Sequence, residues 1–73
     1  MTYRISNTVK GSRNPFSCVR VYDDAGTMIA EQKVNERNPL KYIKRYKKGK
    51  YRAALKEQCL AGGMTSEIFE ELF

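Results

Sequence analysis

The spacing of apolar residues changes along this chain at Asn38 and Pro39. Before that point apolar and polar residues alternate, as they do from Tyr3 to Val9, which is typical of half-buried strands. After it the apolar residues recur at helical spacing. Asn38 and Pro39 also fit a helix start, because an Asn side chain accepts from the free amides of the first turn and Pro has no amide hydrogen to leave unpaired. We therefore expect strands first and helices afterwards.

The alternating part of the sequence predicts three strands, at about residues 2–10, 16–22 and 27–34. Gly and Pro in the segment 11–15 indicate a loop. The segment Asp23-Asp-Ala-Gly26 is typical of a short hairpin turn, and such a turn fixes the register of the strands that it joins. The second strand has apolar residues on both faces, as expected of a central strand with a covered face.

The segment after Pro39 has two possible interpretations, because Gly49 lies in its middle and a helical Gly costs about 1 kcal/mol relative to Ala. In one, a single helix covers about residues 39–60. In the other, a first helix ends near Lys48, is capped by Gly49, and is followed by a second helix from about Lys50. We favour the continuous or slightly kinked helix.

The C-terminal residues predict one more short helix, at about 65–73. Two glycines, Gly62 and Gly63, end the preceding helix, and Thr65 or Ser66 is the expected N-cap of the new one. The fold class that follows is α+β. It consists of a three-stranded antiparallel sheet packed against one long helix, continuous or slightly kinked, with a short C-terminal helix completing the core.

Length and composition favour a single small domain at residues 1–73. The chain has 41% hydrophobic and 30% charged residues, the balance of a globular protein. A domain of this size buries only roughly 60% of the surface of its unfolded chain, so most large apolar residues are needed for the core.

The sequence favours a cytoplasmic protein without a membrane segment. Cys18 and Cys59 are the only cysteines, and both lie among apolar residues, so we expect two buried thiols in a reducing compartment. The residues after Met1 lack the apolar run of a secretion signal. No apolar run approaches the about 20 residues of a membrane span.

Catalytic chemistry is not expected of this sequence. It contains no histidine, the commonest general base and the commonest metal ligand. Two distant cysteines do not make a zinc site, and Asp23 with Asp24 is explained by the hairpin turn. We therefore predict no enzyme activity, no catalytic residue, no metal site and no cofactor.

The strongest functional signal is the segment from Lys41 to Lys56, which contains eight Lys or Arg residues and no acid. A surface that only solvates a helix normally mixes both signs of charge. We expect this segment to bind the phosphate backbone of a nucleic acid, either DNA or RNA, largely without sequence preference. The predicted contacts are Lys41, Lys44, Arg45, Lys47, Lys48, Lys50 and Arg52.

Tyr42, Tyr46 and Tyr51 lie between these basic residues. Their rings have two possible roles, stacking on unpaired bases or filling the core. The core role is favoured because Tyr42 and Tyr46 are four residues apart on one helix face and a small domain needs their area.

A protein partner is the alternative. In size and composition the chain resembles the small early proteins with which phages bind and redirect a host enzyme. That resemblance implies docking of the basic segment on an acidic protein surface, or insertion of the last helix into a groove. The same apolar end is also a candidate homodimer interface. The candidate partner-binding residues are Phe69, Leu72 and Phe73.

The expected order of three strands and a helix, over about residues 2–58, is similar to AP2-type and integrase arm-binding domains. Those domains lay a three-stranded sheet in the major groove of DNA. Here the charge concentrates on the helix, not on the strands, so the resemblance is one of topology and carries no residue across.

Overall fold

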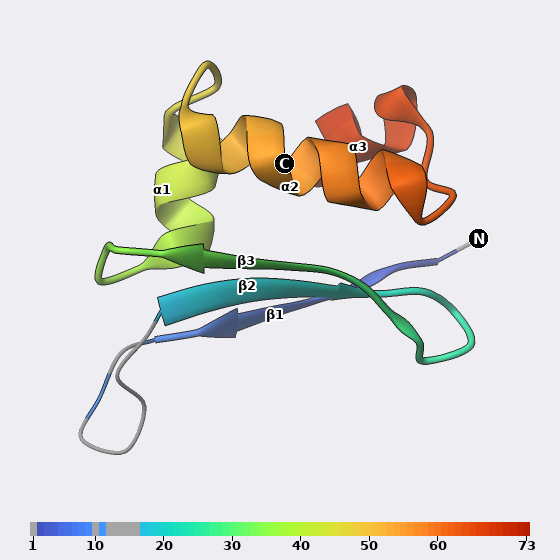
Figure 1. Cartoon of the computed structure of the whole chain (residues 1–73), viewed down its shortest axis with the longest axis horizontal. Coiled ribbons are helices and arrows are strands. Elements are labelled where there is room, and N and C mark those ends of the chain that lie inside the picture. Colours follow the sequence, from blue (N-terminus) through green and yellow to red (C-terminus); the bar gives the residue numbers. More distant parts are fainter. Residues whose placement is uncertain (1, 10, 12–16) are drawn as a thin grey trace.

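The computed structural model describes residues 2–9, 11 and 17–73, and within them a three-stranded antiparallel sheet has its helices on one face (Figure 1). The predicted α+β class and the antiparallel sheet are confirmed. Positions 10 and 16, at the ends of two predicted strands, lie outside the described residues. The elements are β1 (Arg4–Thr8), β2 (Ser17–Tyr22), β3 (Met28–Val34), α1 (Pro39–Arg45), α2 (Lys50–Ala61) and α3 (Ser66–Leu72).

The strands are ordered β1-β2-β3, so β2 is central as predicted. The turn between β2 and β3 forms as its sequence indicates. The carboxylate of Asp23 accepts from the amides of Ala25 and Thr27 at 3.0 and 2.9 Å. Gly26 adopts φ +83°, a conformation that favours glycine.

The core lies between the sheet and the helices. Val19 and Val21 of the central strand are fully buried, and they meet Leu55 and Cys59 of α2 and Phe69 of α3 in one apolar cluster. Burial of such side chains is worth about 1.5–3 kcal/mol each. Both cysteines are buried free thiols, as expected.

The favoured continuous helix over residues 39–60 is not what the chain forms. α1 ends at Arg45, residues 46–49 make a turn, and α2 begins at Lys50 and runs in a different direction (Figure 1). Gly49 is the N-cap of α2, not the C-cap of α1. A Cβ at Gly49 would lie 3.2 Å from the carbonyl oxygen of Tyr46, so the tight turn suits a glycine.

Separate packing demands explain the break. α1 contacts β1 and β2, whereas α2 lies along β3. A single straight helix over residues 39–60 could not pack against β1 and β2 and also lie along β3. The turn lets each helix bury its own apolar side, with Ile43 buried in α1 and Leu55 buried in α2. None of the helices in the described residues is long and apolar enough to cross a bilayer.

Candidate functional site

The start of α1 is fixed to the sheet by two asparagines. Asn38 caps the helix by accepting from the amide of Lys41 at 3.3 Å. Asn7 of β1 donates to the Asn38 side chain at 3.0 Å and accepts from the amide of Leu40 at 3.2 Å. The predicted helix start at Asn38 and Pro39 is therefore confirmed, and a contact from β1 holds α1 in one orientation.

Basic side chains surround the corner where α1 turns into α2. We name this set the corner patch, and all its members are exposed: Lys41, Lys44, Arg45, Lys48 and Lys50. No ion pair joins any of them to an acid among residues 2–9, 11 and 17–73. These members of the predicted basic segment thus lie on a patch that bends with the chain, from α1 through the turn to the first residue of α2.

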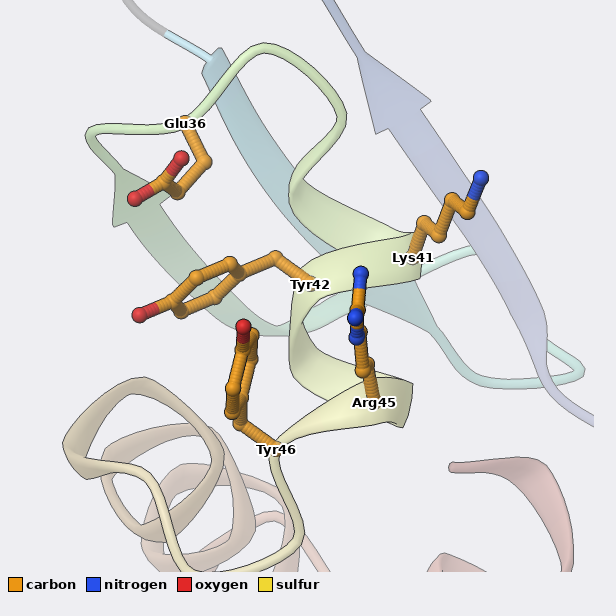
Figure 2. A pocket seen from close by; sticks show the side chains of 5 residues that line it. All are labelled: Glu36, Lys41, Tyr42, Arg45 and Tyr46. Atoms are coloured by element: carbon orange, nitrogen blue, oxygen red, sulfur yellow. The ribbon is translucent and has the colours of Figure 1, made fainter.

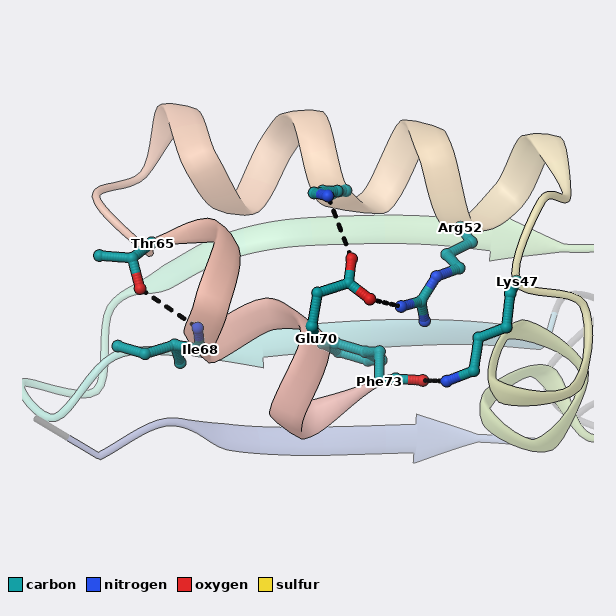
Figure 3. Close-up of polar contacts among 7 residues, drawn as sticks. Lys47, Arg52, Thr65, Ile68, Glu70 and Phe73 are labelled. Carbon is teal, nitrogen blue, oxygen red and sulfur yellow. Dashed lines mark hydrogen bonds and ion pairs between the residues drawn. The ribbon is translucent and has the colours of Figure 1, made fainter.

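Arg52 does not belong to that surface, contrary to the sequence prediction. Its side chain is only 4% exposed, and its Nη2 atom donates to a carboxylate oxygen of Glu70 at 2.6 Å (Figure 3). The guanidinium carbon also lies 5.0 Å from the ring centroid of Phe69. Arg52 therefore joins α2 to α3 inside the fold, because its position on α2 faces the C-terminal helix.

Two neighbouring lysines are also held by the C-terminal segment. Lys56 donates to the second carboxylate oxygen of Glu70 at 3.0 Å. Lys47, a predicted phosphate contact, donates to the backbone carbonyl oxygen of Phe73 at 2.6 Å (Figure 3). The hydrogen bond from Lys56, followed by that from Arg52, lowers the pKa of Glu70. These contacts divide the basic segment into a structural part and the exposed corner patch.

The predicted partner-binding residues at the C-terminal end mostly form core. Phe69 is fully buried, Phe73 is 3% exposed, and their rings stack with centroids 4.7 Å apart. Leu72 is half-buried. α3 packs on α2 because a domain of this size needs both rings, so Phe69 and Phe73 do not make a docking surface.

The three tyrosines form one row of ring contacts at the corner. Tyr51 meets Tyr42 edge to face with centroids 5.9 Å apart, and Tyr42 meets Tyr46 at 4.6 Å. Tyr42 and Tyr51 pack against the core, as favoured from the sequence, whereas the side chain of Tyr46 is 47% exposed. The row therefore runs from the core to the surface.

An open hollow of about 510 Å³ lies beside this row and is shown in Figure 2. We name it the tyrosine hollow. The Glu36 carboxylate and the Tyr42 hydroxyl lie on one side of α1, and the Lys41 ammonium lies on the other (Figure 2). The hollow thus combines aromatic rings, two cations and one carboxylate. It is lined by Glu36, Lys41, Tyr42, Arg45 and Tyr46.

The sheet face opposite the helices also carries basic residues, but they are more engaged. Arg20 donates to the carboxylate of Glu31 at 2.6 Å, and this hydrogen bond raises the pKa of Arg20. The guanidinium of Arg4 lies 4.6 Å from the ring centroid of Tyr22. Of these two cations, Arg20 is paired with an acid, whereas Arg4 keeps its positive charge.

Sequence reasoning missed Asn7 and Glu36. Asn7 contacts Asn38 and Leu40, which are more than thirty residues away in the sequence. Glu36 lies close in sequence to the other residues of the hollow, but it precedes α1 in a loop whose path the local pattern does not predict. Compared with protein-family models, curated proteins and solved structures, the chain matches none of them.

Proposed function

We propose that the protein is a non-catalytic nucleic-acid-binding protein that contacts the phosphate backbone through the corner patch. The observation that carries this proposal is the set of five exposed cations that form no ion pair within the described residues. Two of them, Arg45 and Lys50, lie near the rings of Tyr46 and Tyr51, contacts that leave their charge in place. Like charges so close together repel one another, and an anionic ligand relieves that repulsion. Phosphates spaced along a nucleic acid supply several anions at once.

The rest of the fold supports this assignment. The carboxylate of Glu70 is engaged with Arg52 and Lys56, which are not part of the corner patch, so it does not neutralise the patch. The start of α1 is fixed by Asn7 and Asn38, so part of the patch is presented without much reordering. A preorganised basic surface loses less entropy on binding.

A binding titration with short duplex and single-stranded DNA and RNA tests the proposal. The charge-removing variant Lys44→Gln with Lys48→Gln is compared with Arg4→Gln and Lys33→Gln on the strands, which has the same net charge. We expect the first variant to lose more affinity for every nucleic acid tested. Equal losses in both variants would show an effect of net charge alone. If no nucleic acid binds and a pull-down instead captures a specific protein, the result would favour the alternative in which the chain binds and redirects another protein.

A further inference from the structure

The tyrosine hollow contains more than a phosphate site needs. Lysines alone suffice to neutralise a backbone, yet here the cations lie beside aromatic rings and a carboxylate. The hollow is open to solvent and has a volume of about 510 Å³. A group that satisfies all of these features is planar, carries hydrogen-bond donors and is attached to a phosphate.

The ring that would contact such a group is held in place. The backbone amide of Tyr46 donates to the carbonyl oxygen of Tyr42 at 3.0 Å. The ring of Tyr46 contacts the ring of Tyr42, which in turn contacts Tyr51 and packs against the core. Tyr46 is 47% exposed, and the guanidinium of Arg45 lies 5.7 Å from the centroid of its ring. A tyrosine fixed in this way loses little entropy when a flat ligand stacks on it.

The acidic side chain of the hollow and the ammonium of Lys41 lie on opposite sides of α1 (Figure 2). Glu36 is exposed and forms no ion pair with the described residues. Its carboxylate only accepts hydrogen bonds at neutral pH. A ligand that bridges the two sides presents amino donors to Glu36 and phosphate oxygens to Lys41 or Arg45.

We propose that the tyrosine hollow binds one unpaired nucleobase with an exocyclic amino group, as part of a single strand whose phosphates lie on the corner patch. This inference rests on the proposed function and narrows its ligand. The base stacks on Tyr46, and its amino group donates to Glu36. Thymine and uracil lack that amino donor. In a duplex the base faces are stacked and the pairing edges are occupied, so single strands are preferred.

The test uses single strands of twelve cytidines or twelve thymidines and a mixed twelve-base-pair duplex, with affinity measured by fluorescence anisotropy at fixed salt. Wild type is expected to bind the cytidine strand roughly threefold to tenfold tighter than the thymidine strand, the net effect of one solvent-exposed hydrogen bond. Tyr46→Leu lowers affinity for the cytidine strand roughly tenfold. Tyr46→Phe retains it, and neither variant changes duplex binding.

Glu36→Ala tests the proposed hydrogen bond to the amino group independently of the stacking on Tyr46. Because Glu36 is exposed, its truncation should leave the fold intact. The preference for cytidine over thymidine falls to about one in this variant, while binding of the thymidine strand is kept or strengthened. Equal wild-type affinity for the two strands, or no loss in Tyr46→Leu, overturns the inference. If Lys44→Gln with Lys48→Gln still weakens binding in that case, the proposed function stands without it. Absence of all nucleic-acid binding removes both.

Discussion

Arg52 and Lys44 give a matched pair of variants that separates structural charge from binding charge. Each change to Gln removes one positive charge, but Arg52 is buried and paired whereas Lys44 is exposed. Arg52→Gln removes a charge-assisted hydrogen bond, worth about 1.5–3 kcal/mol, and a cation–π contact worth about 1 kcal/mol. The Nη1 atom of Arg52 is a buried donor without a hydrogen-bond partner within the described residues. Its removal in Arg52→Gln therefore offsets part of that loss.

We therefore expect Arg52→Gln to lower the free energy of unfolding by about 2–3 kcal/mol. For a domain of this size that corresponds to a fall in melting temperature of roughly 10–20 °C. Lys44→Gln changes the free energy of unfolding by less than about 0.5 kcal/mol. Urea unfolding at neutral pH measures the free energy of unfolding of both variants. Nucleic-acid affinity is measured at a temperature well below the melting temperature of each variant, where the protein is folded.

Folded Arg52→Gln should bind nucleic acid nearly as well as wild type, whereas Lys44→Gln should bind more weakly. The reasoning is refuted if Arg52→Gln leaves stability unchanged, or if it weakens binding by folded protein as much as Lys44→Gln does. Either result would mean that the guanidinium of Arg52 is not committed to the contact with Glu70.

Three further changes test the fold. Gly62→Ala would place a Cβ 2.7 Å from the Cβ of Ile29, so urea unfolding should show a loss of about 1–3 kcal/mol, and unchanged stability would contradict this close packing. The pKa of Glu70 is lowered, chiefly by the hydrogen bond from Lys56. The ionised carboxylate therefore stabilises the fold above the ordinary carboxyl pKa, and this stabilisation is lost as the pH falls through the lowered pKa. Glu70→Gln should flatten the decline of stability in acid, as measured by urea unfolding across pH. Burial raises the pKa of Cys59 to about 11 from 9.0, so the stability advantage of wild type over Cys59→Ala should shrink between those values as pH rises, and a constant difference would contradict this.

The strands and the first helix start could be predicted because local patterns determine them. Alternation marks β1 to β3, and the pair Asn38 and Pro39 marks α1 through capping chemistry that needs no distant residue. The break at Gly49 could not be decided in the same way. A cost of about 1 kcal/mol for a helical glycine is small, and it is the separate packing of α1 and α2 on different strands that settles the outcome.

The candidate site was predicted where exposure followed from composition, and missed where it depended on tertiary contacts. The members of the corner patch, four lysines and one arginine, lie on the surface as the composition of the basic segment predicted. Arg52 has the same sequence context, but its partner Glu70 is 18 residues away. Glu36 was missed because it precedes α1 in a loop and reaches the tyrosine hollow only through the fold.

The salt dependence of duplex DNA binding tests the central claim most directly. If the five cations of the corner patch each neutralise one phosphate, the logarithm of affinity should fall against the logarithm of salt concentration with a slope of about −4.5. Lys44→Gln with Lys48→Gln should reduce that slope by about two units, and Arg4→Gln with Lys33→Gln should leave it unchanged. A slope near zero, or equal slopes in both variants, would contradict the account.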